Sequence, residues 1–107
     1  MVKHKHLVLY GFSGFYHCQR NRLQSIISGL EDTAIVLMED AVIGTTKTRK
    51  ISPYASLKYE KITLYCLSED LNARGIDQNN LEPGISPISY PNLIDLIENS
   101  EKLISWL

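Results

Sequence analysis

The sequence predicts an α/β fold, a three-layer α/β/α sandwich with a mainly parallel sheet of about five strands, in one domain that spans residues 1–107. The first reason is that short apolar runs alternate with segments of helical periodicity in the order βαβαβαβαβ. The second is that these runs lack polar alternation, as is typical of strands buried on both faces. The third is length, because 107 residues suffice for one hydrophobic core and not for two.

The first two predicted strands have the same pattern. Residues 7–10 form a continuous apolar run that ends at Gly11. Residues 34–38 form a second run, which ends at Glu39 and Asp40. A helix between two such strands gives the order of a right-handed βαβ unit.

The helix between these strands is predicted from its apolar spacing. Four residues recur at the i, i+3, i+4, i+7 spacing of one helix face: Leu23, Ile26, Ile27 and Leu30. Asn21 is a candidate N-cap, and a start nearer Ser13 or His17 is an open alternative.

The later elements continue the alternation. Residues 41–44 suggest a short helix or turn, and residues 62–67 form a third strand that is rich in β-branched and aromatic residues. A fourth strand over residues 86–90 is expected to be short, because Pro87 weakens it. The last helix and the last strand are expected over residues 92–100 and 103–107.

A short helix is expected directly after the third strand. Ser68 is its candidate N-cap, and Glu69 and Asp70 lie in its first turn. Arg74 lies in its last turn and Gly75 just beyond it. Acids near the start and a cation near the end complement the helix dipole, and glycine favours the left-handed conformation that ends many helices.

Composition argues against several classes of protein. A net charge of -1 gives no overall field that would attract nucleic acid or an anionic membrane. No apolar run approaches the roughly 20 residues of a membrane span, and the first residues lack the apolar core of a signal peptide. We therefore expect a cytoplasmic protein with no membrane partner and with both cysteines reduced.

Metal and cofactor sites are not predicted. The two cysteines cannot form a four-ligand zinc site without histidines. His4 and His6 would share one face of a strand and could bind an ion, but no third ligand is in view. Beside Lys3 and Lys5, they are expected to form a solvated entrance to the first strand.

Nucleotide-binding and hydrolase motifs are missing from the sequence. It contains no G-x-G-x-x-G, no P-loop and no G-x-S-x-G, and residues 11–14 offer only a flexible turn. Lys47, Arg49 and Lys50 form a small basic cluster that could contact RNA phosphate, although a solvated loop is the simpler interpretation.

Acidic residues are expected at one edge of the sheet. Ligands of open parallel sheets bind outside the carboxyl ends of the strands. Four acids follow predicted strands there: Glu39, Asp40, Glu69 and Asp70. The simplest interpretation is that they lie in the first turns of helices for electrostatic reasons. Asp40 is the candidate exception, because it closely follows a buried strand at the ligand-binding edge.

Cys18 is the candidate reactive residue. It follows His17 and stands just ahead of Arg20 and Arg22, and cations and a helix start favour the thiolate form of a cysteine. A thiolate in this place could accept and release sulfur by exchange. Cys66 lies inside an apolar strand, where a cysteine is expected to be buried and inert.

Four segments together resemble a known family. They are the strand and acidic pair at residues 36–42, the stretch LYCLSEDLNARG at residues 64–75, the segment ISPISY at residues 85–90 with the leucines after it, and the terminal Trp106 and Leu107. Each segment alone is common, whereas the four in this order are fairly specific. Over nearly its whole length the chain resembles the DsrH/TusB family of small sulfur-relay subunits.

The resemblance implies a subunit of a sulfur-relay complex of the DsrEFH/TusBCD type. Such complexes pass persulfide sulfur toward 2-thiolation of the tRNA wobble uridine, or serve a related dissimilatory pathway. The partners would be homologous DsrE/DsrF- or TusD/TusC-type subunits in a heterohexamer, with indirect contact to tRNA.

The resemblance also implies which subunit carries the sulfur. The best established carrier cysteine belongs to the DsrE/TusD-type partner. Some family members have a cysteine in their first helix, and that position aligns near Ile26 and not with Cys18. The implied role is therefore architectural, with no firmly assigned catalytic residue in this chain.

Subunit contacts are expected from aromatic residues in excess of a small core, because such residues are favoured in interface cores. The candidates are Tyr90, Trp106 and the segment near Tyr54 and Tyr59, together with the acidic residues Glu39, Asp40 and Asp70. Trp106 has a core position as its alternative.

Two other functions stay open: a self-contained sulfurtransferase or thiol sensor that uses Cys18, and a homo-oligomeric ligand- or RNA-binding module of the same fold.

Overall fold

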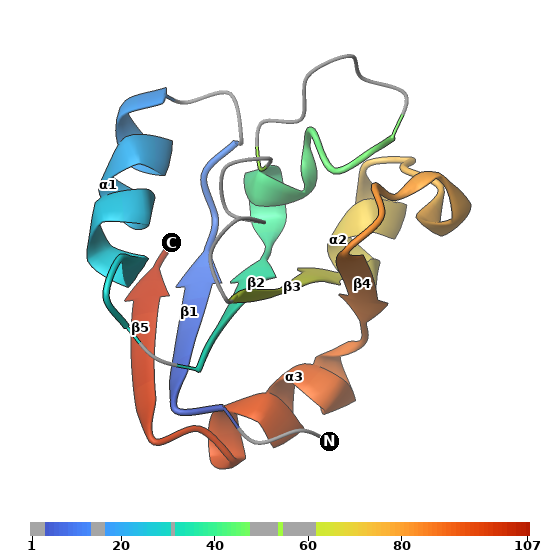
Figure 1. The fold of residues 1–107 in the computed structure, drawn as a ribbon. Helices are drawn as coiled ribbons and strands as arrows, with labels where there is room; N and C mark the ends of the chain where they lie inside the picture. The colour runs from blue at the N-terminus through green and yellow to red at the C-terminus, as the bar shows by residue number, and fades with distance from the viewer. Residues whose placement is uncertain (1–3, 14–16, 31, 48–53, 55–61) are drawn as a thin grey trace.

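A parallel sheet forms the centre of the molecule (Figure 1). The computed structural model describes residues 4–13, 17–30, 32–47, 54 and 62–107, without the side chains of residues 17–20 and 26. In this part of the chain five strands pair in the order β4-β3-β2-β1-β5, and every neighbouring pair is parallel. The strands are β1 (His6–Tyr10), β2 (Thr33–Leu37), β3 (Ile62–Leu67), β4 (Ile85–Ile88) and β5 (Lys102–Trp106).

Helices and short 3-10 turns connect the strands. They are α1 (His17–Ile27), η1 (Glu39–Val42), α2 (Ser68–Ala73), η3 (Gln78–Asn80) and α3 (Tyr90–Glu98). Helix α1 begins at His17, so the earlier of the two predicted starts is correct and Asn21 is not its N-cap. Gly75 has the expected left-handed φ of 67° just beyond the end of α2.

Two predicted helix starts are corrected by the structure. The N-cap position of α2 is occupied by Leu67, so Ser68 is the first helical residue and not the cap. No side chain makes a capping hydrogen bond at this helix start. Tyr90 opens α3 and does not end β4, because β4 stops at Ile88. In both cases the strand passes into the helix with little or no intervening loop.

Each face of the sheet has its own core, which makes three layers. Helix α1, η1 and α2 supply residues to one face, including Leu23, Val42 and Leu71. Helix α3 covers the other face through Leu93 and Leu96. The sheet of the α/β/α sandwich is therefore buried on both sides, which explains the unbroken apolar runs in the sequence.

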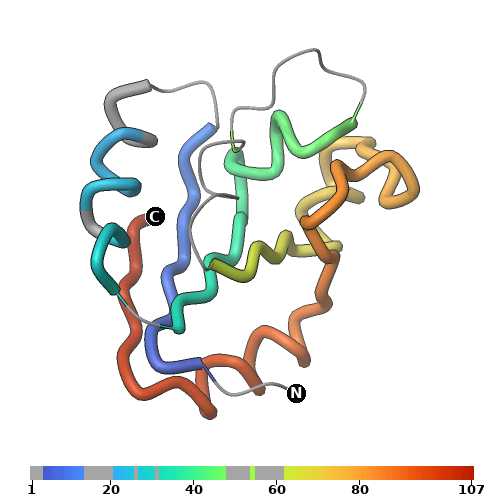
Figure 2. Tube along the Cα trace, in the orientation of Figure 1, coloured from blue at the N-terminus to red at the C-terminus, as the bar shows by residue number. Residues whose placement is uncertain are grey.

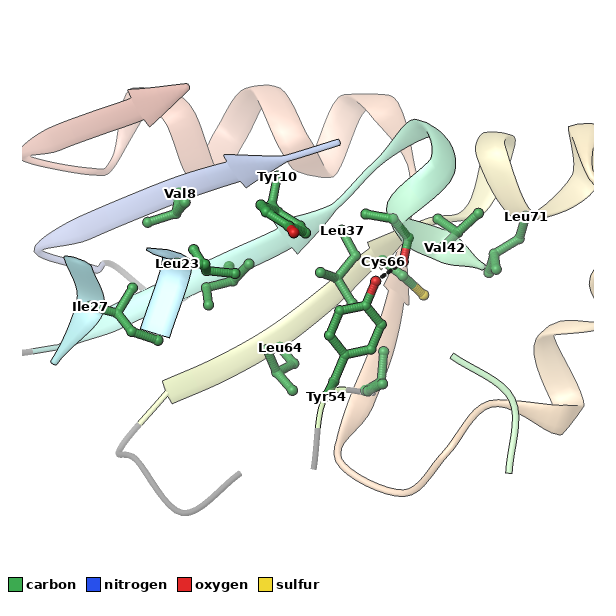
Figure 3. Packing of buried hydrophobic residues seen from close by; sticks show 13 residues of the cluster. Val8, Tyr10, Leu23, Ile27, Leu37, Val42, Tyr54, Leu64, Cys66 and Leu71 are labelled. Atoms are coloured by element: carbon green, nitrogen blue, oxygen red, sulfur yellow. Dashed lines mark hydrogen bonds between the residues drawn. The ribbon is translucent and has the colours of Figure 1, made fainter. Parts of the chain in front are cut away.

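Tyr54 belongs to the core and not to a subunit interface. Its side chain is fully buried, and Figure 3 shows the ring near Leu37 and Leu64. The hydroxyl donates a hydrogen bond to the carbonyl oxygen of Ala41, which satisfies its polar end inside the core. The expectation that this tyrosine contacts a partner is therefore wrong, whereas Tyr59 lies outside the described residues.

All five carboxyl ends of the strands meet at one edge of the sheet. After β1 the chain passes through α1 to β2, which lies on one side of β1. The last strand, β5, lies on the other side of β1. The order in which successive strands are added to the sheet therefore reverses between β1 and β5, which are neighbours and pair Tyr10 with Trp106. Figure 2 shows that the last residues come back beside α1. By the rule for open sheets, ligand sites are expected along this edge.

Candidate functional site

Two of the four predicted acids, Asp40 and Asp70, meet around one cation at the carboxyl edge of the sheet, and Glu39 joins them through its backbone. Asp70 accepts a hydrogen bond from the backbone N–H of Glu39 at 2.7 Å. Arg74 donates to the carboxylate of Asp40, with Nη2 and Oδ1 3.0 Å apart, and its Nη1 lies 3.7 Å from Oδ1 of Asp70. We call these four residues, Glu39, Asp40, Asp70 and Arg74, the acidic rim.

The acidic rim fastens η1 to α2. Asp70 lies in the first turn of α2, as predicted, but its carboxylate binds the start of η1. Glu39 has a left-handed φ of 51°, which costs free energy in a non-glycine residue, and the bond to Asp70 helps to hold that conformation. Sequence reasoning placed Arg74 near the helix dipole and missed that it bridges two turns. The contact with Asp70 has i,i+4 spacing, whereas the contact with Asp40 joins residues 34 apart and has no local signal.

Glu69 has a separate role at the start of α3. Its Oε2 accepts a hydrogen bond from the backbone N–H of Tyr90 at 3.1 Å, which places a negative charge at the N-terminus of that helix. Its Oε1 is buried and has no hydrogen-bond partner among the described residues. The side chain of Tyr90 is 47% exposed, so it remains available for contact with a partner.

Trp106 lies at the other end of the same sheet edge, within a small aromatic group. Its ring lies 5.8 Å from that of Tyr10 and 6.5 Å from that of Phe12, both at steep angles. The indole is half-buried and also lines a groove of about 360 Å³ with Asn21, Arg22 and Ser25 of α1. Trp106 therefore packs against the core and also lines an open groove.

Cys66 is buried and chemically quiet. It is fully inaccessible in β3, as predicted, and Figure 3 shows it among the core residues near Val42. Burial raises the pKa of its thiol from 9.0 to about 12, so the thiolate is negligible near neutral pH. Cys18 is the second residue of α1, and its side chain lies outside the described set.

His4 and His6 are buried, so the predicted solvated entrance to β1 is wrong. His4 lies with Nδ1 3.3 Å from the carboxylate of Asp32 and Nε2 3.3 Å from the hydroxyl of Tyr65. Because the carboxylate only accepts, a neutral ring donates from Nδ1 and accepts from Tyr65. Burial also raises the pKa of Tyr65, which keeps its hydroxyl protonated.

Within the described residues, no group of three or more His, Cys, Asp or Glu side chains is placed to hold a metal ion. In the same part of the chain, no helix is long and apolar enough to cross a membrane.

Of the small basic cluster, Lys47 is exposed and donates its N–H to the carbonyl of Asn80, while Arg49 and Lys50 lie outside the described residues.

Comparisons with known proteins support the family resemblance. The model of a family described as "DsrH like protein" matches residues 17–103. Protein TusB of Buchnera aphidicola subsp. Baizongia pistaciae (strain Bp) is 27% identical over 88 residues, which cover 78% of this chain and 83% of that protein.

Two solved structures share the fold. The ychN protein from E. coli matches with a TM-score of 0.77 over 96% of this chain and 99% of that one, at 14% identity. MTH1491 from Methanobacterium thermoautotrophicum, described as a protein of unknown function, matches with a TM-score of 0.62. The match covers 85% of this chain and 89% of that one, at 15% identity. Identities this low speak for the fold alone.

Proposed function

The chain belongs to the DsrH family of sulfur-relay subunits, and from this premise we propose that it serves 2-thiolation of the tRNA wobble uridine as an architectural subunit. The observation that carries the proposal is the family match over residues 17–103. Similarity to Protein TusB favours the tRNA pathway over a dissimilatory one.

The described side chains favour an architectural role over a nucleophilic one. Cys66 is enclosed in the core, and its raised pKa leaves it protonated near neutral pH. Within the acidic rim, the carboxylates of Asp40 and Asp70 bind Arg74, and Asp70 also accepts from a backbone N–H, so both hold turns in place. Neither arrangement supplies an activated nucleophile. As the family resemblance implies, the sulfur carrier of the proposed complex is a cysteine of a partner subunit, and this chain shapes the complex around it.

The partners are homologous DsrE/DsrF- or TusD/TusC-type subunits in the cytoplasm, with tRNA contacted through the assembled complex. Tyr90 and Asp40 are proposed as contact residues, because both are exposed at the carboxyl edge of the sheet. An aromatic ring beside a charged residue is common in protein interfaces.

Native mass spectrometry of the chain with two homologous small α/β partners from the same organism tests this proposal. We expect a complex that contains all three chains. Tyr90→Glu should weaken it, whereas Glu98→Lys, at the far end of the same helix, should not. A chain that ignores both partners would refute the proposal.

A further inference from the structure

The outer edge of β5 has no partner among the described residues. Lys102 donates its N–H to the carbonyl of Lys5, and the carbonyl of Trp106 accepts from Gly11, so these positions of β5 face β1. Successive residues of a strand direct their backbone groups to opposite sides. The N–H and C=O groups of Leu103, Ser105 and Leu107 therefore point away from the sheet.

The two edges of the sheet differ in their protection. β4, at the opposite edge in Figure 1, is short and contains Pro87, which lacks the N–H that an added strand would need. β5 has no proline, and it is flanked by exposed apolar side chains, with Leu103 48% and Leu107 52% exposed. Of the two edges, as the described residues define them, the β5 edge is therefore the one open to strand addition.

Apolar side chains stand on both faces of this open edge. Leu103 pairs with Leu7, which belongs to the core on the α3 side, so Leu103 and Leu107 lie on that face. Ile104 and Trp106 pack on the α1 side and are half-buried. A strand that pairs here must offer apolar residues on both of its faces.

We propose that β5 pairs antiparallel with β5 of a second copy of this chain, about a two-fold axis at Ser105. In this register Leu103 lies opposite the partner's Leu107, and Ile104 lies opposite the partner's Trp106. The two copies of Ser105 face each other. Apolar residues then match on both faces, and the charge of Lys102 lies outside the paired segment, where it remains solvated.

Other symmetric registers fit less well. A two-fold axis at Ile104 sets Leu103 against the partner's Ser105 and Lys102 against the partner's Trp106. An axis at Leu103 sets Lys102 against the partner's Ile104. An axis at Lys102 opposes two like charges, which is destabilising. Among the axes at Lys102, Leu103, Ile104 and Ser105, the apolar and charge patterns therefore select the one at Ser105.

The groove between α1 and Trp106 fits the same arrangement. Cross-strand neighbours lie on the same face, so the partner's Ile104 would stand beside Trp106 on the α1 side. The groove of about 360 Å³ that Trp106 lines with Asn21, Arg22 and Ser25 opens at this place. RNA fits this surface less well, because leucines flank the edge and Arg22 is the single cation among the described residues that line the groove.

Sedimentation of the chain alone, over a wide concentration range, tests the proposal independently of the sulfur relay. We expect a dimer with a dissociation constant on the order of 10 µM, because a single strand pair is a small interface. Leu103→Glu should weaken the dimer at least tenfold, since it sets a carboxylate against the partner's Leu107. Ile94→Glu is the matched control, because Ile94 is similarly exposed, at 54%, but lies on α3.

Ser105→Pro is a second variant that spares the internal sheet. It removes an outward N–H and should also weaken the dimer, while circular dichroism stays unchanged. A chain that stays monomeric at about 500 µM would overturn the proposal. So would a dimer that tolerates both Leu103→Glu and Ser105→Pro.

Disulfide trapping tests the register itself. In a Cys18→Ser background, Ser105→Cys should give a covalent dimer under mild copper-catalysed oxidation, because facing residues of paired strands lie within disulfide range. Ser86→Cys, on the exposed part of β4, is the matched control and should stay monomeric. Equal cross-linking of both variants, or none for Ser105→Cys, would overturn the proposed register.

Discussion

Burial sets the chemistry of Cys66. Its side chain lies in β3, in the same buried cluster as Val42 and Leu71 (Figure 3), and the surrounding apolar side chains disfavour the charged form. The raised pKa, about 12, means that folding holds the proton more tightly than the unfolded chain does. Stability linked to this group is therefore fully present below pH 9 and is lost as the pH rises toward 12.

Replacing Cys66 with alanine should change the pH dependence of stability. At neutral pH we expect the variant to lose about 1 kcal/mol, because a small cavity replaces the sulfur. Between about pH 9 and 12 the wild-type free energy of unfolding should fall more steeply than that of the variant, so the gap should narrow. Urea unfolding at several pH values measures this. Tyr65 titrates in both proteins, so its contribution cancels in the difference between them. Parallel plots of unfolding free energy against pH would contradict the raised pKa of Cys66.

His4 shows why some single residues escape sequence reasoning. Lysines at positions 3 and 5 suggest a solvated segment, yet His4 is only 4% exposed. Its two partners, Asp32 and Tyr65, are 28 and 61 residues away in the chain. A side chain whose burial depends on such distant groups has no local signal to reveal it.

Contacts between elements position the carboxyl edge of the sheet. Asp70 in α2 binds the start of η1, and Arg74 joins Asp70 to Asp40. These bonds fix the turn after β2 against the helix after β3. The edge is therefore preformed, which suits a surface that docks with a partner.

Asp70→Ala should loosen this connection. We expect a loss on the order of 0.5 to 1 kcal/mol, because the N–H of Glu39 loses its acceptor and Arg74 loses one carboxylate. Asp40→Ala is the matched control and should cost less, since Asp40 is 64% exposed and solvent screens its ion pair. Chemical denaturation measures both. Unchanged stability in Asp70→Ala, with partner binding lost, would mean that Asp70 acts in binding and not in structure.

Most elements could be predicted from the sequence, and the errors have a common cause. The strand at residues 62–67 is found without error, because buried apolar runs between polar segments have few other interpretations. Ser68 was misread as a cap and Tyr90 as a strand residue, since β3 passes directly into α2 and only Ser89 separates β4 from α3. The gathering of Asp40, Asp70 and Arg74 depends on the sheet order, which periodicity does not encode.

At the scale of the whole molecule, the fold offers two separate surfaces. The acidic rim and Tyr90 occupy the carboxyl edge, while the open side of β5 occupies one margin of the sheet. The first is the proposed site for homologous relay subunits and the second for another copy of this chain. A small subunit with these two proposed docking surfaces and an enclosed Cys66 would be suited to organising a complex whose sulfur carrier lies in another subunit.

Cys18→Ser in the reconstituted relay tests this architectural account most directly. The measurement is the 2-thiouridine content of tRNA, with assembly followed by native mass spectrometry and Cys66→Ala as the control. The account predicts intact assembly and nearly unchanged thiolation, because the partner subunit supplies the persulfide. A relay that assembles but stalls, together with a gain of one sulfur mass at Cys18 in the wild type, would contradict it and make this chain a carrier.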